Sequence, residues 1–331
     1  MNYKRLGRSG LKVSTICLGT ITFGGQVNEA DAERMVKYAL DEGVNFFDTA
    51  DAYINGKSEE ILGKALKGAR ESVVLATKLG RWKSGPGVND AGLSRKHIMH
   101  EVENSLRRLG TDYIDLYICH APDDGTPIEE TLRALDDLIH QGKIRYIACS
   151  NFRAFQLSEA LWASERCNLF RFDCIQTPYN LITRDIEYEL LPLCANRGVG
   201  VTVYNPLAAG LLTGKHDPSR SPEAGTRFAA GAFGQHYSDR YWLPRNFEAV
   251  AKLKKYTDDR NYKLAQFALA WTLNNPVVTS VICGVTSLEQ LKQNLGAVDI
   301  KLTSGDIDVC DKVWEDISPP RFLYGKPYSS I

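Results

Sequence analysis

Short apolar segments that end in polar residues recur along this chain, with segments of helical spacing between them. Each apolar run is too short for a helix and is bounded by turn-forming residues, which is typical of a buried strand. One of them, Val44-Asn45-Phe46-Phe47-Asp48, is followed by a polar loop that contains Tyr53. The eight strand candidates span residues 16–20, 44–48, 73–78, 114–120, 144–151, 174–177, 199–204 and 279–284.

The intervening segments carry start and stop signals for helices. Asn28 precedes a helical pattern over 29–41 that stops at Gly43, and Ser94 precedes one that runs to Gly110. Asn and Ser are favoured at the residue that precedes a helix because their side chains accept backbone hydrogen bonds there. The other predicted helices span about 58–68, 126–142, 154–167, 185–197, 246–259, 262–275, 287–295 and 303–316.

Strands that alternate with helices predict an α/β chain. We favour a closed (β/α)8 TIM barrel in which residues 1–331 form a single domain, with long loops at the active-site end. Residues 3–15, with Arg8-Ser9-Gly10 at their centre, predict a small N-terminal hairpin, and the stretch 205–246 contains no strand candidate. The alternative is an open doubly wound sheet, which usually carries a G-x-G-x-x-G motif after its first strand. We find no such motif in the chain.

Charge and composition argue against several classes of function. Lys and Arg together number 40, as do Asp and Glu, and no basic run stands out, so nucleic acid is not expected as a partner. No apolar stretch approaches the roughly 20 residues of a membrane span, so no membrane partner is expected either. The eight cysteines include no C-x-x-C pair, which indicates reduced thiols in a cytoplasmic protein.

Ionisable side chains of complementary type stand at the ends of successive strand candidates. Asp48, Lys78 and His120 each end an apolar run, and Tyr53 follows Asp48 in a segment broken by Asn55-Gly56. In a parallel barrel the carboxyl ends of the strands meet at one rim, and the active site lies there. The fold therefore predicts that these four side chains gather at the mouth of the barrel.

The four side chains form a set that could protonate a carbonyl oxygen. A phenol has a pKa of about 10, and a nearby ammonium group lowers it by stabilising the phenolate. We expect Lys78 to act in this way on Tyr53, with Asp48 as its counter-ion. His120 would hydrogen-bond a substrate oxygen, which becomes negative as a hydride reaches the carbonyl carbon. The same residues also fit a structural Lys78–Asp48 ion pair beside a core histidine.

Nearly the whole chain resembles the aldo-keto reductase superfamily. The stretches that carry the resemblance are residues 43–50 with Tyr53, 56–63, 76–78, 106–117 with His120, 149–152, Gln176 and 206–215. The last stretch, PLAAGLLTGK, is similar to the branch that includes potassium-channel β-subunits and many bacterial reductases. The resemblance implies a (β/α)8 barrel that binds NADPH in extended form without a Rossmann motif.

The resemblance also implies roles for individual residues. Tyr53 would be the general acid and Lys78 would tune it. Asp48 would partner Lys78, and His120 would orient the substrate. The cofactor contacts that it implies are Gly19, Thr20, Ile21, Asp48, Ser150, Asn151, Gln176 and Tyr204 at the nicotinamide; Asn205, Pro206, Leu207 and Lys215 at the pyrophosphate; and Arg227, Gly284, Thr286, Gln290 and Asn294 at the adenosine end.

One departure concerns the choice between NADP and NAD. Many relatives place Arg or Lys around 284–290 to bind the 2′-phosphate, whereas this chain has Gly284, Thr286 and Gln290 there. The channel β-subunit branch uses a loop arginine instead, and Arg227 could take that part. NADP (as NADPH) is therefore the expected cofactor, with NAD as the alternative.

The resemblance implies an NAD(P)H-dependent oxidoreductase of the alcohol dehydrogenase type, which reduces an aldehyde or ketone, sugars included. The substrate contacts are expected from the loops, at Phe23, Trp82, Tyr241 and Trp242, with the tail 320–328 as a further candidate. The alternative is a cofactor-binding regulatory or partner-binding module of the channel β-subunit type with weak turnover. A metal-dependent hydrolase is disfavoured and no metal is expected, because only His120 among the histidines ends a strand. The sequence leaves the oligomeric state open.

Overall fold

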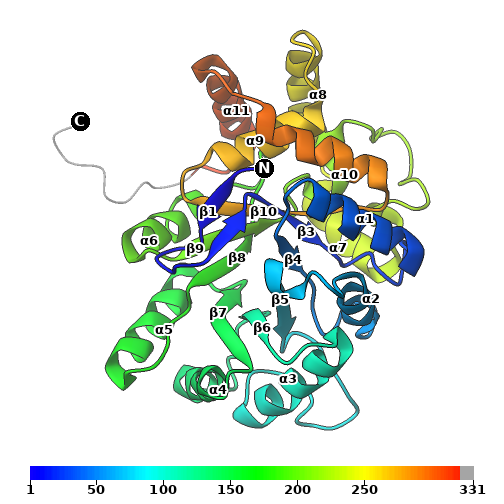
Figure 1. Ribbon diagram of the computed structural model, residues 1–331. Helices are drawn as coiled ribbons and strands as arrows, with labels where there is room; N and C mark the ends of the chain where they lie inside the picture. Colours follow the sequence, from blue (N-terminus) through cyan, green and yellow to red (C-terminus); the bar gives the residue numbers. More distant parts are fainter. Residues whose placement is uncertain (321–331) are drawn as a thin grey trace, which may run out of the picture.

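The computed structural model describes residues 1–320, with residues 232 and 233 described by their backbone alone, and it forms a closed barrel (Figure 1). Neighbouring barrel strands are parallel throughout, in the order β10-β3-β4-β5-β6-β7-β8-β9. The expected (β/α)8 barrel is therefore confirmed. The strands are β3 (Ile16–Gly19), β4 (Phe46–Asp48), β5 (Val74–Leu79), β6 (Ile114–Cys119), β7 (Ile144–Ser150), β8 (Cys174–Pro178), β9 (Gly200–Tyr204) and β10 (Val278–Gly284).

The predicted N-terminal hairpin is also present and closes the end of the barrel where the strands begin. β1 (Tyr3–Arg5) pairs antiparallel with β2 (Lys12–Ser14). Leu6 and Val13 are fully buried and belong to the apolar cluster inside the barrel. The turn approaches the chain before β9 so closely that a Cβ on Gly7 would lie 2.6 Å from the Gly198 carbonyl oxygen. The opposite end of the barrel is left for the site.

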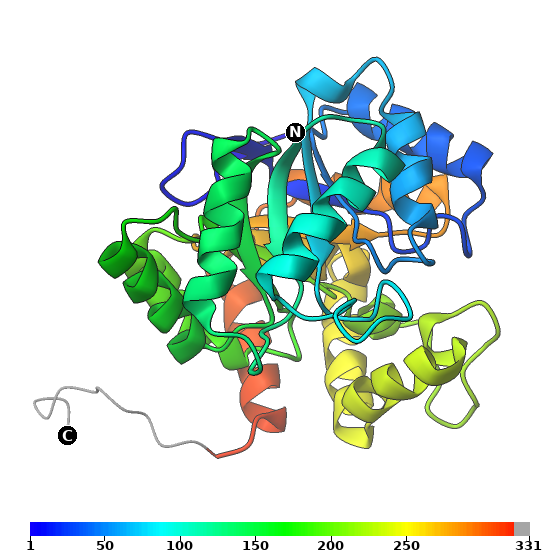
Figure 2. The same ribbon diagram turned by 90° about the horizontal axis from the view of Figure 1, so that it is seen from below.

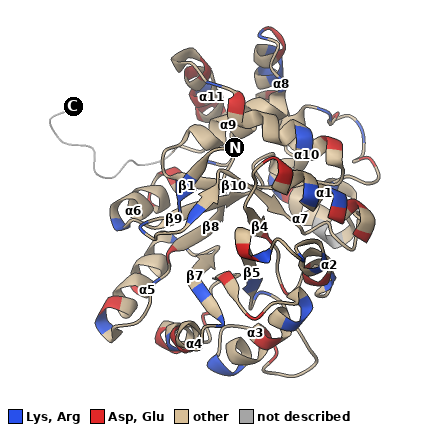
Figure 3. Ribbon diagram, viewed as in Figure 1, with Lys and Arg blue, Asp and Glu red and all other residues tan. Residues whose placement is uncertain are grey.

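The helices surround the barrel, and Figure 2 shows α7 and α8 projecting from one end of it. Charged residues of both signs are interspersed along the surrounding helices (Figure 3). Two predicted caps are present: Asn28 accepts a hydrogen bond from the Asp31 amide (2.9 Å), and Ser94 accepts one from the His97 amide (3.3 Å). The helices are α1 (Glu29–Asp41), α2 (Lys57–Ala65), α3 (Arg95–Leu109), α4 (Ile128–His140), α5 (Ala154–Cys167), α6 (Leu190–Arg197), α7 (Gly231–Tyr241), α8 (Pro244–Asp258), α9 (Leu264–Asn274), α10 (Leu288–Leu295) and α11 (Ser304–Ile317).

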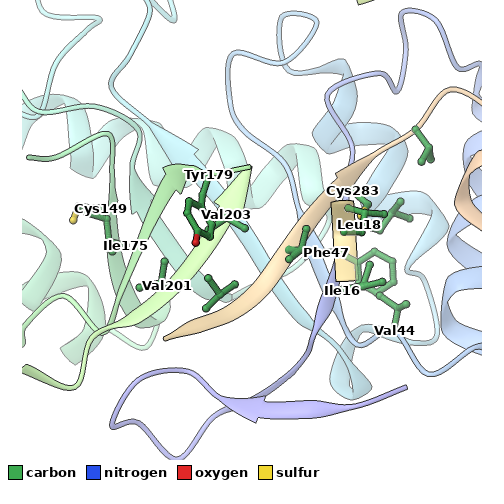
Figure 4. Packing of buried hydrophobic residues seen from close by; sticks show 14 of the residues in the cluster. Ile16, Leu18, Val44, Phe47, Cys149, Ile175, Tyr179, Val201, Val203 and Cys283 are labelled. Carbon is green, nitrogen blue, oxygen red and sulfur yellow. The ribbon is translucent and has the colours of Figure 1, made fainter. Parts of the chain in front are cut away.

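Buried apolar residues form one core between the helices and the strands and a second core inside the barrel. In β3, Ile16 and Leu18 face the helices (Figure 4), and Cys17 belongs to the inner cluster. In β4, Phe47 faces outward and Phe46 inward. Successive side chains of a strand point to opposite faces, so both cores are filled from the same short apolar runs.

The structure differs from the sequence prediction at two places. The segment predicted as one helix over 185–197 is divided into a 3-10 helix, η2 (Asp185–Glu187), and α6. Pro192 explains the break, because inside a longer helix its ring would clash with the preceding turn and leave a carbonyl without its donor. The stretch 205–246 contains no strand, as expected, but it is not one long loop. It contains η3 (Ala208–Thr213), η4 (Arg227–Ala229) and α7.

Among residues 1–320, no helix combines the length and the apolar character that a membrane crossing requires. All eight cysteines are free thiols, and only Cys167 is more than slightly exposed.

Candidate active site

Strand alternation turns the polar strand ends toward the mouth of the barrel. Phe46 and Ala76 belong to the inner cluster, and the side chains two residues further on are those of Asp48 and Lys78. A step of two residues keeps a side chain on the same face of a strand. The same step leads from Ile118 to His120, from Ala148 to Ser150 and from Cys174 to Gln176.

Lys78 lies at the centre of this group and is wholly buried. Its Nζ donates to Asp48 Oδ1 (2.6 Å), to the Thr49 carbonyl oxygen (2.6 Å) and to Tyr53 Oη (3.1 Å). An ammonium group has three protons, so all of its donors are used and one of them is directed at the phenol. Gln176 Nε2 donates to the other oxygen of Asp48 at 2.9 Å, which fixes the carboxylate in turn.

The charges of the buried pair follow from these contacts. Burial alone would lower the pKa of Lys78, but Asp48 and then Tyr53 outweigh it and raise that pKa above its ordinary value, so the ammonium persists at neutral pH. Burial raises the pKa of Tyr53, and Lys78 acts in the opposite direction. The effect expected of Lys78 on the phenol is therefore present, but burial outweighs it. Tyr53 holds its proton at neutral pH, as a general acid must.

His120 lies against Tyr53 and is 4% exposed. Its ring meets that of Tyr53 edge-on, with centroids 5.9 Å apart, and that of Trp82 at 5.2 Å. Burial, together with the charges of Lys78 and Arg81, holds the pKa of His120 well below its ordinary value. The imidazole is therefore neutral and carries one N–H donor. Its Nδ1 has no hydrogen-bond partner among residues 1–320.

Asn151 connects the ends of three strands around the mouth. Its Nδ2 donates to the His120 carbonyl oxygen (2.8 Å) and to Ser150 Oγ (3.0 Å), and its Oδ1 accepts from Tyr204 Oη at 2.6 Å. The residue has a left-handed backbone with φ of 63°, which Asn tolerates better than most residues. Asn151 thereby sets the position of the Tyr204 ring.

A cavity of about 610 Å³ opens over these side chains. Asp48, Tyr53 and His120 line it, whereas Lys78 lies behind them. Every residue that the resemblance implied for the dinucleotide also lines this cavity: Gly19, Thr20, Ile21, Asp48, Ser150, Asn151, Gln176, Tyr204, Asn205, Pro206, Leu207, Lys215, Arg227, Gly284, Thr286, Gln290 and Asn294. The structure thus brings together residues that are more than 270 positions apart in the chain, such as Gly19 and Asn294.

The loop after β9 forms one wall of the cavity in a strained conformation. Asn205, Ala208 and Ala209 all have positive φ values, of 54°, 48° and 58°. For an alanine, a left-handed backbone costs roughly 1–2 kcal/mol. Such strain persists where the surrounding structure requires it, most often at ligand sites. Here it turns the chain back sharply enough for both Leu207 and Lys215 to face the cavity.

Within the cavity, Arg227 occupies the space beside Gly284. A Cβ on Gly284 would lie 2.7 Å from Arg227 Nη2, so the glycine makes room for the guanidinium group. Arg227 Nη1 donates to Tyr237 Oη at 3.3 Å. Beside it, Gln290 Oε1 accepts from the Thr286 amide at 2.9 Å at the start of α10. Arg227 therefore lies in the cavity beside Gly284, another of the residues expected to contact the adenosine.

The residues expected to contact substrate separate into two groups. Trp82 lines the cavity and is 37% exposed. Phe23 and Tyr241 are buried in the core, and Trp242 packs edge-on against Phe228 and Phe247, so the structure does not bring these three side chains to the cavity. The tail 320–328 lies outside the described residues except for its first position.

Helix α7 supplies lining residues that are not among the four substrate contacts expected above. His236, Tyr237 and Arg240 face the cavity, and Tyr241 on the same helix is buried. Residues 236, 237 and 240 have the spacing of one helical face. That periodicity is the sequence signal for α7, a helix that is not among the predicted elements. The other unassigned lining residues include Gln26, Ala209, Gly210, Thr213, Gly225, Thr226, Ala265 and Gln293.

Asp51, three residues after Asp48, is a buried carboxyl group beside the site. It is 6% exposed, and its Oδ1 accepts from the Ala52 amide at 2.6 Å. Its Oδ2 has no partner among the described residues. Burial, and then the charges of Glu101 and Glu59, raise the pKa of Asp51 to about 8.

We expect Asp51→Asn to raise the free energy of unfolding at alkaline pH by roughly 1–3 kcal/mol, because the amide removes the buried, unpartnered negative charge that forms there. Because folding raises this pKa, the native protein holds a proton that the unfolded chain releases above about pH 4. The parent therefore loses stability as the pH rises from there to about 8, where the native carboxyl ionises too. Urea unfolding near pH 5 and near pH 9 should show a gain that grows with pH, and an equal gain at both would contradict this.

Comparison with known proteins gives a family match and close relatives. Residues 15–315 match the Aldo/keto reductase family. The chain is 42% identical over 305 residues to a protein of Arabidopsis thaliana described as a probable voltage-gated potassium channel subunit beta, covering 91% of this chain and 92% of that protein. A protein of Oryza sativa subsp. japonica with the same description is 41% identical over the same shares. The family match includes all the barrel strands. It also includes the four side chains at the mouth, those of Asp48, Tyr53, Lys78 and His120.

Proposed function

The chain belongs to the aldo/keto reductase family, and on that premise we propose that it is an NAD(P)H-dependent oxidoreductase that reduces an aldehyde or a ketone to the alcohol. The observation that carries the proposal is the placement of Lys78 Nζ between Asp48 Oδ1 (2.6 Å) and Tyr53 Oη (3.1 Å). Carbonyl reduction requires a proton donor beside a cavity, and Tyr53 lines the cavity with its proton held.

The side chains divide the work at the carbonyl oxygen. Tyr53 Oη transfers its proton to that oxygen, and the ammonium of Lys78 stabilises the phenolate that remains. Asp48 keeps Lys78 charged and in place. The neutral His120 donates its N–H to the same oxygen and orients it. When bound, the dihydronicotinamide supplies the hydride to the carbonyl carbon.

The donor set of the cavity fits a dinucleotide. Ser150, Asn151 and Gln176 offer the hydroxyl and amide groups that would hold a carboxamide, and the ring of Tyr204 would stack on the nicotinamide. Lys215 provides a cation for the pyrophosphate, and Arg227 one for a 2′-phosphate. All of these residues line one continuous cavity with Tyr53. These contacts support NADP as the cofactor, with NAD as the alternative.

We expect Arg227→Met to weaken NADPH binding about tenfold or more, because a charge-assisted bond to the 2′-phosphate would be lost. NADH, which lacks that phosphate, should bind with nearly unchanged affinity. Fluorescence titration of the purified protein with each cofactor measures the two dissociation constants. The matched control is Lys215→Met, which should weaken both cofactors alike. An equal loss for both cofactors in Arg227→Met would contradict the assignment.

The proposed function is tested by turnover. The purified protein should oxidise NADPH or NADH in the presence of a panel of aldehydes, ketones and sugar aldehydes, and the loss of nicotinamide absorbance reports the rate. A panel with no turnover by either cofactor would contradict the proposal.

The relatives support a second candidate function. Their description as probable channel β-subunits suggests a cofactor-binding regulatory or partner-binding module with weak turnover. Enzymes commonly turn over at about 1–10³ per second. Tight NADPH binding with turnover below about 0.01 per second on every carbonyl compound would favour the module over the enzyme.

A further inference from the structure

A second cavity of about 620 Å³ lies next to the first. Tyr53, Trp82 and Tyr237 line both cavities, so the second cavity begins beside the phenol of Tyr53. Ile54, Asn55 and the other lining residues are mostly apolar or uncharged. A pocket of this kind usually selects its ligand through a few placed polar groups.

Asp51 is the lining residue whose polar atoms are least satisfied. Its Oδ2 is buried and has no partner among residues 1–320, and Asp51 is one of the residues that line the second cavity. The buried hydroxyl of Tyr117 likewise has no partner in the described part of the chain. Burial raises the pKa of Tyr117, and the charge of Asp51 raises it further.

Arg108, a cation that lines the second cavity, is already paired with two other carboxylates. Arg108 donates to Glu59 Oε2 (2.6 Å) and to Glu101 Oε1 (2.7 Å). The hydroxyl of Thr77 donates to the other oxygen of Glu59, Oε1, at 2.6 Å. The guanidinium group of Arg108 is thus shared between two buried carboxylates, and its hydrogen bonds to carboxylates go to these two rather than to Asp51. Asp51 is thus an additional carboxyl group beside a cluster that already holds two carboxyl groups and one guanidinium group.

We propose that the second cavity is a substrate subsite in which Asp51 accepts a hydrogen bond from a donor at the remote end of the carbonyl compound. This rests on the proposed reduction at Tyr53. The shared chemistry is a hydrogen-bond donor, carried either by a hydroxyl group or by a protonated amine. Asp51 is then a specificity-determining residue that touches the substrate away from the reacting carbonyl group.

The test uses benzaldehydes with a meta or para substituent, because the rigid ring holds the substituent away from the aldehyde. Methyl, hydroxymethyl, dimethylaminomethyl and carboxy substituents provide the neutral reference, the two donors and an anion. Near pH 9, where Asp51 is ionised in the parent enzyme, we expect kcat/KM for at least one donor to exceed that for the methyl compound about tenfold, as for a hydrogen bond to a charged group. Asp51→Ala should bring this ratio close to one.

Asp51→Asn separates the two kinds of donor. Its oxygen can keep the bond from the Ala52 amide while an NH2 group replaces Oδ2. A hydroxyl group can accept a hydrogen bond from that NH2 group, so a hydroxyl preference should largely survive. A preference for the protonated amine should be lost. Because each result is a ratio to the methyl compound in the same variant, a general loss of active enzyme does not affect it.

A second variant tests the cavity without changing Asp51. Ser84 is exposed and lines only the second cavity of the two. Ser84→Phe should reduce kcat/KM for the substituted benzaldehydes severalfold relative to unsubstituted benzaldehyde.

The outcomes separate this inference from the proposed function. If the methyl compound is reduced but the donors have no advantage, or their advantage survives in Asp51→Ala, or the carboxy compound is preferred, the subsite is overturned and the reductase stands. If no benzaldehyde is reduced with either cofactor, both are overturned.

Discussion

Lys78→Met should abolish carbonyl reduction, lowering kcat by about 10³-fold or more, while the dissociation constant for NADPH changes little. General acid catalysis contributes about 10²–10⁴-fold, and Lys78 is the group that stabilises the phenolate left by Tyr53. The Lys78 side chain does not line the cavity, so its loss should leave the cofactor contacts in place. Steady-state turnover and a fluorescence titration on the same preparation measure both quantities.

This variant also leaves Asp48 as a buried carboxylate whose only remaining side-chain donor in the described part of the chain is Gln176. Breaking a buried ion pair by removing one partner commonly costs about 3–5 kcal/mol, so the single variant will be less stable. The double variant Asp48→Asn with Lys78→Met removes the unpaired charge and should recover most of that stability without recovering activity. Lys67→Met, at an exposed position, is the matched control and should behave as the parent. Turnover near the parental rate in Lys78→Met would refute the proposed role.

Tyr53→Phe should lower kcat by about 10²–10⁴-fold, because it removes the proton donor and keeps the ring. The fold should be unaffected, since Lys78 retains its bonds to Asp48 and Thr49. The control is Tyr256→Phe, which removes a hydroxyl that donates to Asp306 Oδ1 (2.9 Å), outside the cavity. Stopped-flow measurement of a single turnover isolates the chemical step from cofactor release.

The pH dependence gives this prediction a second readout. A general acid is active while it holds its proton, so reduction should be constant at neutral pH and decline as the pH rises through the pKa of Tyr53. Burial raises that pKa above the ordinary value of about 10, so the decline should begin only in strongly alkaline solution. The residual rate of Tyr53→Phe should lack this decline. A residual rate that keeps the same alkaline decline would assign it to another group.

Most of the barrel could be predicted from local patterns. The run Phe46-Phe47-Asp48 alternates between the inner and outer cores, and the expected strand over 44–48 is present as β4. The caps at Asn28 and Ser94 are contacts between residues three positions apart, so the sequence alone contains both partners. The same alternation turns Asp48 and Lys78 to one face, and the parallel topology brings that face to one rim.

Other features depended on which segments meet in space. Phe23 and Tyr241 are aromatic residues in predicted loops, but neighbouring elements cover them, and the cavity instead receives Tyr237. Arg227 fits into the cavity beside Gly284 because that distant residue has no side chain to exclude it. No pattern along the chain reports that Phe23 and Tyr241 are covered or that Arg227 meets Gly284, since both depend on contacts between segments far apart in sequence.

The sequence by itself thus determined the succession of strands and helices and the set of polar groups at the barrel mouth, because periodicity and capping act between near neighbours. Only the tertiary structure decided how strongly each group is buried and what surrounds it. That is why Tyr53 has a raised pKa despite its ammonium neighbour, and why one oxygen of Asp51 has no partner among the residues that the structure describes. Desolvation and long-range pairing are properties of the packed molecule, and they set the chemistry of these side chains.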